Sequence, residues 1–256
     1  MFSIYTSLYN LSGGFIDYKA ALDNFCSFAD EVVVGTTMDS KDDTIELLQE
    51  YQNINYKVKL AITDFKLNTA EFDGQIKNAA LKLCTKKFCI LLDGDEEIPL
   101  YTKDYWMKYA NFIKDREDID GVLIPSINLC GDKYHYKDIG YKFYLHKNEI
   151  GIERGIVNYA KLSNGKINTK LSDTTEPIIN GELAKFIGLS NILEDIKDNK
   201  LPFVFHHWGD NAENRIKQNK FWSPIWASRS GKKADDIIVD KNELNLIQKY
   251  PHNLLI

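Results

Sequence analysis

The stretch FCILLDGDEEIP, residues 88–99, decides the fold. It begins with five apolar residues, Phe88 to Leu92, and then turns abruptly acidic at Asp93-Gly94-Asp95. A short apolar run bounded by a turn signal predicts a fully buried strand. In open α/β sheets, ligands bind where such strands end. Two carboxylates one residue apart can turn toward one hard cation such as Mg²⁺ or Mn²⁺, although an acidic surface turn also fits an isolated motif.

The residues before this stretch alternate between strand and helix patterns. The clearest helix begins at Asp73, because apolar residues follow at helical spacing: Ile76, Ala79, Ala80 and Leu83. Strands are expected over 2–8, 31–35 and 56–62, and helices over 15–28, 44–51 and from 73. This β-α-β-α-β-α-β order with short connections predicts an α/β fold with a mainly parallel central sheet flanked by helices.

After Pro99 the pattern becomes that of a mixed α+β half. Strands are expected over 121–129, 134–146 and 203–206, and helices over 105–113, 181–197 and 241–250. No repeat or low-complexity linker separates the two parts. We therefore expect a single domain over residues 1–256, with halves at 1–120 and 121–256.

Composition excludes several classes of protein. The net charge of −5 argues against a nucleic-acid partner, which normally requires a basic face. No apolar stretch approaches the roughly 20 residues of a membrane span, and the first residues lack the pattern of a signal peptide. The four cysteines form no CxxC pair, which fits a reducing, cytoplasmic compartment.

Three motifs together resemble the GT-A glycosyltransferases of the family 2 type. TSLYN, residues 6–10, is similar to the Thr/Pro-x-Tyr-Asn turn after the first strand, with one residue to spare. SKDDT, residues 40–44, matches the end of the family's Asp-rich loop, and Asp39 substitutes for its nucleotide-contacting aspartate. GQIKNAALKLCTKKFCILLDGDEEI, residues 74–98, looks like the family's helix leading into the DxD strand, with Lys77 for the usual arginine.

The resemblance covers about residues 1–100 well and 120–230 weakly. It implies a GT-A type nucleotide-binding fold, with a nucleotide-sugar-binding half at 1–120 and an acceptor-side half at 121–256. The implied activity is metal-dependent transfer of a hexose or deoxyhexose, with inversion, from a nucleoside-diphosphate sugar to an acceptor hydroxyl. A glycan, a lipid-linked or a protein-linked acceptor would fit, and Mn²⁺ or Mg²⁺ would neutralise the leaving diphosphate.

The resemblance also assigns residues to the donor site. Asp95 would bind the metal directly, while Asp93 would hold the ribose or a metal-bound water. The nucleotide pocket would comprise these two acids with Thr6, Tyr9, Asp39, Lys77 and Gly94. Tyr9 would stack on the base and Asp39 would accept from its N–H, whereas Lys77 fits a phosphate-facing or a solvated position equally. Glu96 and Glu97 are expected in a solvated loop.

A histidine is expected to complete the metal site with Asp93 and Asp95. His206 and His207 follow a predicted strand, and neighbouring residues of an extended chain point to opposite faces. At most one of them should therefore enter the site, and His207-Trp208-Gly209 has the family's H-x-G spacing. Imidazole suits Mn²⁺ better than Mg²⁺. Two structural histidines are the alternative.

The catalytic base has three candidates in the second half. Inversion requires a carboxylate that removes the acceptor proton. Asp173 is the first choice, and Glu176 and Glu153 are the others; capping of a turn explains Asp173 equally well.

The basic, aromatic stretch 215–229 is expected to cover the core, and contact with a membrane surface is its alternative use.

Two other classes of function remain open. A phosphatase of the haloacid-dehalogenase type also places DxD at a strand end and binds Mg²⁺, although its first aspartate is a nucleophile near the N-terminus. A catalytically inactive module that binds sugar nucleotides is the other.

Overall fold

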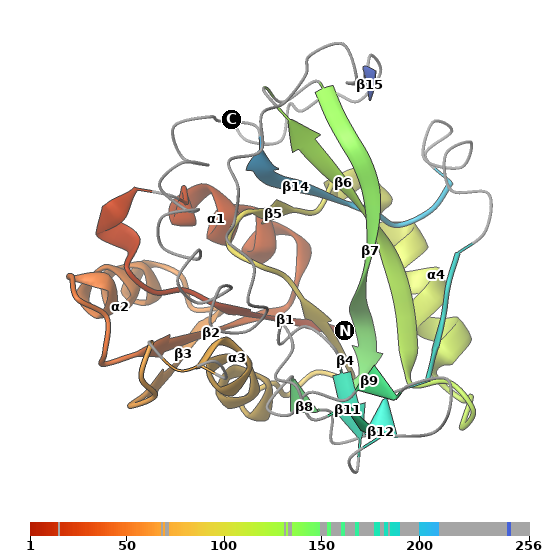
Figure 1. The fold of residues 1–256 in the computed structure, drawn as a ribbon, viewed down its shortest axis with the longest axis horizontal. Coiled ribbons are helices and arrows are strands. Elements are labelled where there is room, and N and C mark those ends of the chain that lie inside the picture. Colours follow the sequence, from red (N-terminus) through yellow and green to blue (C-terminus); the bar gives the residue numbers. More distant parts are fainter. Residues whose placement is uncertain are drawn as a thin grey trace.

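The computed structural model has an α/β architecture built on one long, curled sheet (Figure 1). It describes residues 1–14, 16–67, 69, 72–130, 132, 135–148, 185–189 and 200–209, and the short strands 153–154, 160–161, 167–168, 177–179, 182–183 and 245–246. The predicted fold class is confirmed: the first half of the sheet is parallel and the second half is mixed.

The first half follows the predicted alternation of strands and helices. Its strands are β1 (Phe2–Ser7), β2 (Glu31–Thr37), β3 (Val58–Thr63) and β4 (Phe88–Leu91). Its helices are α1 (Tyr18–Phe28), α2 (Thr44–Ile54) and α3 (Phe72–Lys82), and a 3-10 turn η1 (Leu11–Gly13) follows β1. The order β3-β2-β1-β4 is parallel throughout, so the carboxyl ends of these strands lie at one edge.

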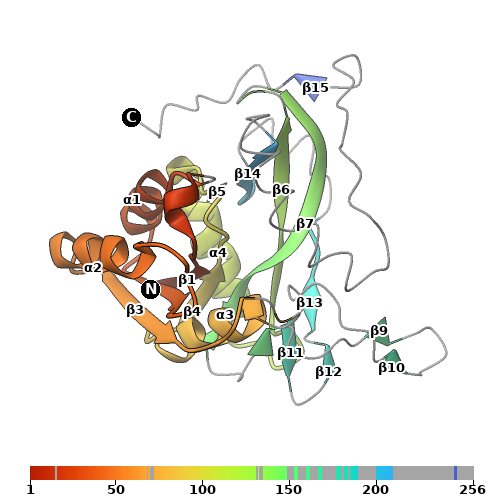
Figure 2. The ribbon, with the colours of Figure 1, turned by 60° about the vertical axis from the view of Figure 1, so that its left-hand side comes forward.

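The second half extends this sheet with both antiparallel and parallel pairs. It contains β5 (Glu96–Glu97), η2 (Leu100–Thr102), α4 (Lys103–Ile113), β6 (Gly121–Cys130), β7 (His135–Lys147) and β14 (Val204–Gly209). β7 pairs with β4 and β6, while β14 lies between β6 and β5. The long strands β6 and β7 stand away from α1 and α2 (Figure 2). This arrangement carries β5 and β14 to the same region as the end of β4.

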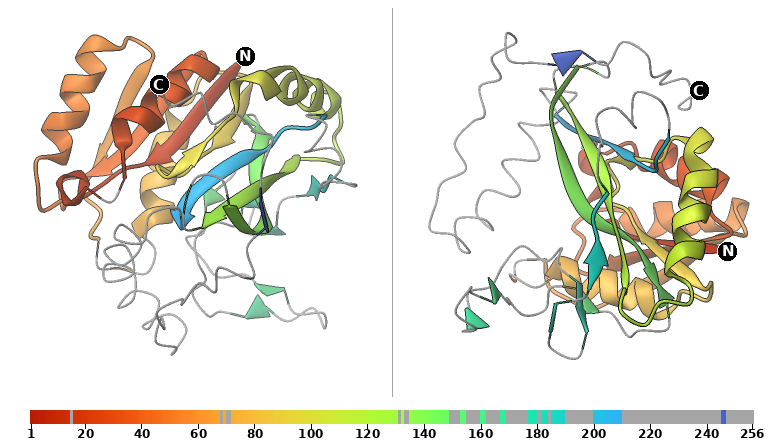
Figure 3. Two further views of the ribbon diagram at one scale, coloured as in Figure 1. Left: turned by 90° about the horizontal axis from the view of Figure 1, so that it is seen from above. Right: turned by 90° about the vertical axis from the view of Figure 1, so that its right-hand side faces the viewer.

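Helices cover both faces of the parallel strands, because successive side chains of a strand point to opposite sides. One face, with Phe2, Ile4 and Phe88, packs in a core cluster with residues of α1, α2 and α4. The opposite face, with Tyr5, packs against Ala80 and Leu81 of α3. Figure 3 shows α4 alongside the β6–β7 pair. No helix in the described ranges is long and apolar enough to cross a membrane.

The remaining short strands are β8 (Glu153–Arg154), β9 (Ala160–Lys161), β10 (Ile167–Asn168), β11 (Pro177–Ile179), β12 (Glu182–Leu183), β13 (Phe186–Ile187) and β15 (Asn245–Leu246). The predicted helix over 181–197 is wrong where the chain is described, because β12 pairs with β11 and β13 pairs with β6. The predicted helix over 241–250 is likewise wrong at 245–246, where β15 pairs with β7. Pairing with distant strands overrode local helical spacing in both segments. The stretch 215–229 lies outside the described residues.

Candidate functional site

The Asp93-Gly94-Asp95 turn follows β4 at the carboxyl edge of the parallel strands. The amide of Glu96 donates to the carbonyl oxygen of Asp93 over 3.1 Å, which closes the turn. Gly94 is tightly enclosed: a Cβ at this position would lie 2.5 Å from Cδ2 of Leu8. The glycine therefore lets the turn pack against the end of β1.

A buried lysine holds the first aspartate of this turn. Lys77 Nζ on α3 lies 2.8 Å from Asp93 Oδ1 and 2.7 Å from Asp73 Oδ2. Its side chain is 3% exposed, whereas that of Asp93 is 28% exposed. Burial alone would lower the pKa of Lys77, but the charges of Asp73 and Asp93 outweigh it and raise the pKa above its ordinary value. Lys77 therefore stays an ammonium, and the solvated alternative for it is wrong.

Asp73 is a residue of this site that the sequence interpretation missed. Ser7 Oγ, at the end of β1, donates to Asp73 Oδ1 over 2.7 Å. Asp73 thus ties α3 to β1 while it orients the Lys77 ammonium. The signal was available, because Asp and Lys four residues apart lie on the same side of a helix.

Glu96 and Glu97 correct the expectation of a solvated loop. They form β5 and are only 2% and 3% exposed. Glu96 Oε1 accepts from the Tyr144 hydroxyl over 2.6 Å, and Oε2 accepts from the Asp93 amide over 2.7 Å. Burial and the charge of Glu96 raise the pKa of Tyr144, so its phenol remains a donor. Glu96 is therefore a buried residue that stabilises the turn through its hydrogen bonds to the Asp93 amide and Tyr144.

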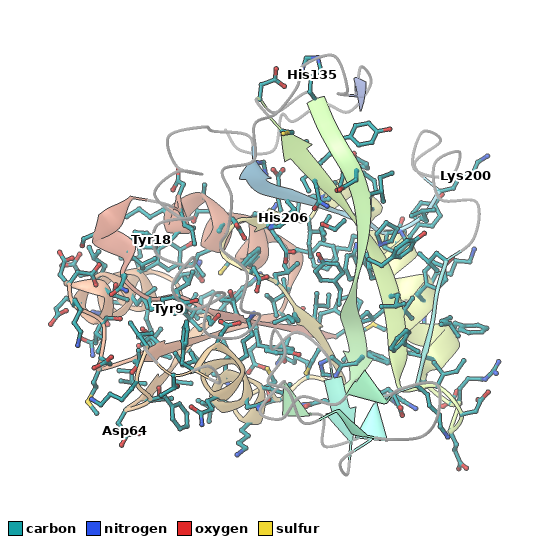
Figure 4. All side chains as sticks on the ribbon, viewed as in Figure 1. Tyr9, Tyr18, Asp64, His135, Lys200 and His206 are labelled. Carbon is teal, nitrogen blue, oxygen red and sulfur yellow. The ribbon has the colours of Figure 1, made fainter. Side chains whose placement is uncertain are left out.

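The two histidines of β14 face different carboxylates. His207 Nε2 lies 3.1 Å from Glu97 Oε2, and the His207 amide donates to the carbonyl oxygen of Asp95 over 2.8 Å. His206 Nε2 lies 3.6 Å from Asp95 Oδ2. In Figure 4 the labelled His206 lies where β14 meets β5, whereas His135 lies at the far tip of β7. The imidazole beside the second aspartate of the turn is therefore that of His206.

Asp39 lies in the loop after β2, within a cluster of donors. Its Oδ1 is 3.0 Å from Lys41 Nζ and 3.3 Å from Lys66 Nζ, and its Oδ2 accepts from the Leu67 amide over 3.0 Å. The hydrogen bonds from Lys41 and from the Leu67 amide lower the pKa of Asp39 to about 2. Asp39 is therefore an ionised acceptor.

Tyr9 and Thr6 occupy different depths at the end of β1. The half-buried Tyr9 ring stands edge-on to Phe72, with centroids 5.2 Å apart. Thr6 is fully buried, and its hydroxyl has no hydrogen-bond partner among the described residues. Tyr9 is thus partly open to a ligand, whereas the Thr6 side chain lies beneath the surface.

The candidate bases are not assembled by the described residues. Asp173 and Glu176 lie outside the described ranges. The backbone of Glu153 belongs to β8, which pairs with β11 and lies beside α3. This places one candidate segment next to the helix that carries Asp73 and Lys77.

The carboxylates and imidazole of this site are ligand types that a divalent cation accepts. Within the described part of the chain, no group of three His, Cys, Asp or Glu side chains is arranged as a metal cage. Mg²⁺ and Mn²⁺ sites of phosphate-transferring enzymes commonly use one or two carboxylates plus oxygens of the substrate. Asp95, with Asp93 and the His206 imidazole nearby, fits that kind of open site.

Comparisons with known proteins give weak structural likeness only. No protein-family model matches this chain, and no curated protein sequence matches it. S. aureus TarS 1–349 aligns at 16% identity over 90% of this chain and 66% of that chain, with a TM-score of 0.45. The same protein in complex with UDP aligns at 14% identity over 90% and 66%, with a TM-score of 0.43.

A second solved structure is glucosyl-3-phosphoglycerate synthase from Mycobacterium tuberculosis in complex with Mn²⁺, uridine diphosphate and phosphoglyceric acid. It aligns at 14% identity over 59% of this chain and 56% of that chain, with a TM-score of 0.35. This chain therefore spans less than two thirds of these TarS 1–349 and glucosyl-3-phosphoglycerate synthase chains. Because all these TM-scores are low, a function has to rest on the chain's own residues.

Proposed function

We propose that this chain is a metal-dependent glycosyltransferase of the GT-A, family 2 type. It would transfer a hexose or deoxyhexose from a nucleoside-diphosphate sugar to an acceptor hydroxyl, with inversion. The observation that carries the proposal is the Asp93-Gly94-Asp95 turn at the carboxyl edge of a parallel sheet. Lys77 holds one of its acids from within, and an imidazole lies beside the other.

Asp93 and Asp95 would have different roles in binding the donor. Lys77 already compensates the charge of Asp93, which leaves that carboxylate suited to accept from a ribose hydroxyl or a metal-bound water. Asp95 supplies the direct oxygen ligand. When bound, Mn²⁺ or Mg²⁺ would neutralise the charge that develops on the leaving diphosphate.

The third metal ligand is proposed to be a histidine of β14. The resemblance favoured His207, but His207 is held at Glu97, while His206 lies 3.6 Å from Asp95. We therefore assign the role to His206. His206→Ala should raise the Mn²⁺ concentration needed for half-maximal activity, and His207→Ala should not. The reverse result would return the role to His207.

The nucleotide pocket is proposed to lie between the ends of β1 and β2. The Tyr9 ring would pack on the base, and the ionised Asp39 would accept from its N–H. Thr6 would act through its backbone, because its side chain is buried. Residues 1–120 would form this donor half, and residues 121–256 the acceptor side, for a glycan, lipid-linked or protein-linked hydroxyl.

The base that removes the acceptor proton is proposed to be Asp173, with Glu176 and Glu153 as the other candidates. Asp173→Asn should lower the rate constant far more than it weakens donor binding. An unchanged rate, with loss in Glu176→Gln or Glu153→Gln, would assign the role to that residue.

A thermal-shift panel of nucleoside diphosphates and sugar nucleotides, with and without Mn²⁺, tests the proposed function. A ligand at about 100 times its Kd should stabilise the fold by roughly 2.7 kcal/mol. If none raises the melting temperature in Mn²⁺ or Mg²⁺, the donor assignment fails. Hydrolysis of p-nitrophenyl phosphate without sugar-nucleotide turnover would favour the phosphatase alternative.

A further inference from the structure

Three adjacent strands place polar side chains in one row that leads to Asp95. Asn128 on β6 pairs with Asp138 on β7 and with His206 on β14. Directly paired residues of a sheet project to the same face, so the three side chains can form a chain of hydrogen bonds. The row ends at His206 Nε2, 3.6 Å from Asp95 Oδ2.

Asp138 determines which way the Asn128 amide points. The amide nitrogen of Asn128 donates to Asp138 Oδ1. A carboxylate only accepts hydrogen bonds, so the group that faces it must be the NH₂ and not the carbonyl. The carbonyl oxygen Oδ1 is therefore turned the other way, where it lies 2.9 Å from His206 Nδ1 and also accepts from Ser126 Oγ over 3.4 Å.

The orientation of the Asn128 amide in turn determines which nitrogen of the His206 ring carries the proton. An amide oxygen cannot donate, so Nδ1 of His206 must carry the hydrogen of this 2.9 Å contact. In neutral imidazole the other nitrogen then presents a lone pair, and this nitrogen faces Asp95. The distance of 3.6 Å is too long for a direct hydrogen bond. Two electron-rich atoms that converge in this way suit a shared cation.

We propose that Asn128 and Asp138 are positioning residues that hold His206 in the Nδ1–H tautomer, with Nε2 directed at the cation site beside Asp95. The inference rests on the proposed function for its metal, but the tautomer is a property of the protein alone. Ligand histidines commonly donate their second N–H to such a partner, and loss of the partner weakens metal affinity by about 10- to 100-fold.

Imidazole nitrogen NMR of the full chain, labelled with ¹⁵N-histidine and free of metal and nucleotide, tests the tautomer. The chain has five histidines, so His206→Gln identifies the relevant signals. Wild type should show Nδ1–H for His206. Asn128→Leu, which removes the acceptor, and Asp138→Asn, which frees the amide to flip, should both populate the Nε2–H form. Asp138 is exposed, so its variant remains informative if Asn128→Leu fails to fold.

Mn²⁺ binding to the same proteins, followed by electron paramagnetic resonance, supplies the second readout. Both variants should bind Mn²⁺ about 10- to 100-fold more weakly than wild type. Asp118→Asn is the matched control, because it removes an exposed carboxylate before the opposite end of β6 and should change neither readout.

The two proposals fail in different ways. An Nε2–H ring in wild type, or variants with unchanged tautomer and unchanged Mn²⁺ affinity, would overturn the positioning role. An Nδ1–H ring in a wild-type protein that binds neither Mn²⁺ nor any sugar nucleotide would instead overturn the proposed function, and the metal-directed role with it.

Discussion

Each end of the parallel sheet pairs a lysine with a carboxylate, and the two ends differ in whether that carboxylate can still bind a ligand. At the amino end, Glu31 of β2 accepts four hydrogen bonds, two at each oxygen. The donors are Ser3 Oγ, Lys59 Nζ and both the amide and hydroxyl of Thr85. Four donors fill the lone-pair capacity of a carboxylate. Glu31 therefore serves the fold alone.

At the carboxyl end, the lysine and not the carboxylate is the more buried partner of the ion pair. The lysine is the enclosed partner, since Lys77 is 3% exposed, and Asp93 is the partner that reaches solvent at 28%. At the amino end Glu31 is 4% exposed and Lys59 is 47% exposed. A carboxylate that is held from behind by a buried ammonium keeps a face for a ligand. One that is enclosed by its donors does not.

The first test of the difference between the two ends removes each lysine in turn. Lys77→Met would leave Asp73 and Asp93 without their shared ammonium, and breaking a buried pair costs about 3–5 kcal/mol. Lys59→Met should cost roughly 1 kcal/mol, because its ammonium is half exposed and the other Glu31 donors remain. Urea unfolding of the two variants measures the difference. Equal losses would remove the distinction between the two ends.

The second test removes charge at the ligand-facing end without touching the packing. Asp95→Asn should leave the free energy of unfolding nearly unchanged, as expected for a site on a turn. A metal ligand contributes several kcal/mol to charge stabilisation, so transfer should fall by roughly 10²- to 10³-fold. Steady-state rates at saturating Mn²⁺ measure it. Transfer at the wild-type rate would end the metal assignment of this turn.

The sequence predicted the position of the carboxyl-end turn better than it predicted the contacts around that turn. Strand and helix periods between Phe2 and Leu92 are local properties, and they gave the order of elements and the position of the Asp93-Gly94-Asp95 turn. The roles of Glu96 and Glu97 were not accessible in this way. Their partners Tyr144 and His207 are 48 and 110 residues away, and adjacent acids after a turn look solvated until those partners are known.

Which of the two histidines lies beside Asp95 also depends on residues that are far apart in the chain. Alternation along a strand correctly indicated that His206 and His207 face different groups. Which one meets Asp95 depends on how β14 pairs with β5 and β6, and this register is set by residues far apart in the chain.

The third test is the counterpart of Asp95→Asn at the structural end. Glu31→Gln keeps the shape of the side chain, but its NH₂ group cannot accept, so the two hydrogen bonds at one oxygen are lost and the two at the other become neutral. The substitution should therefore cost about 2–3 kcal/mol of stability. The folded fraction should transfer sugar at the wild-type rate. Chemical denaturation and specific activity, measured on the same preparation, check both statements. A loss of specific activity without a loss of stability would assign Glu31 to the site.

The smallest expected effect is the pH dependence that Glu31 confers. Burial alone would raise its pKa, but the hydrogen bonds from Lys59, Ser3 and Thr85 outweigh it and lower the pKa from 4.5 to about 2. A carboxyl whose folded pKa is depressed stabilises the fold above its unfolded pKa and loses that contribution as pH falls toward the folded value. Wild type should therefore lose about 2 kcal/mol from this group between roughly pH 5 and pH 3. Glu31→Gln has no carboxyl there, so the difference in unfolding free energy between the two proteins should shrink by that amount over this range. A difference that stays constant from about pH 5 to pH 3 would mean that Glu31 keeps an ordinary pKa in the fold. The hydrogen bonds to Glu31 would then not distinguish it from the partly exposed Asp93.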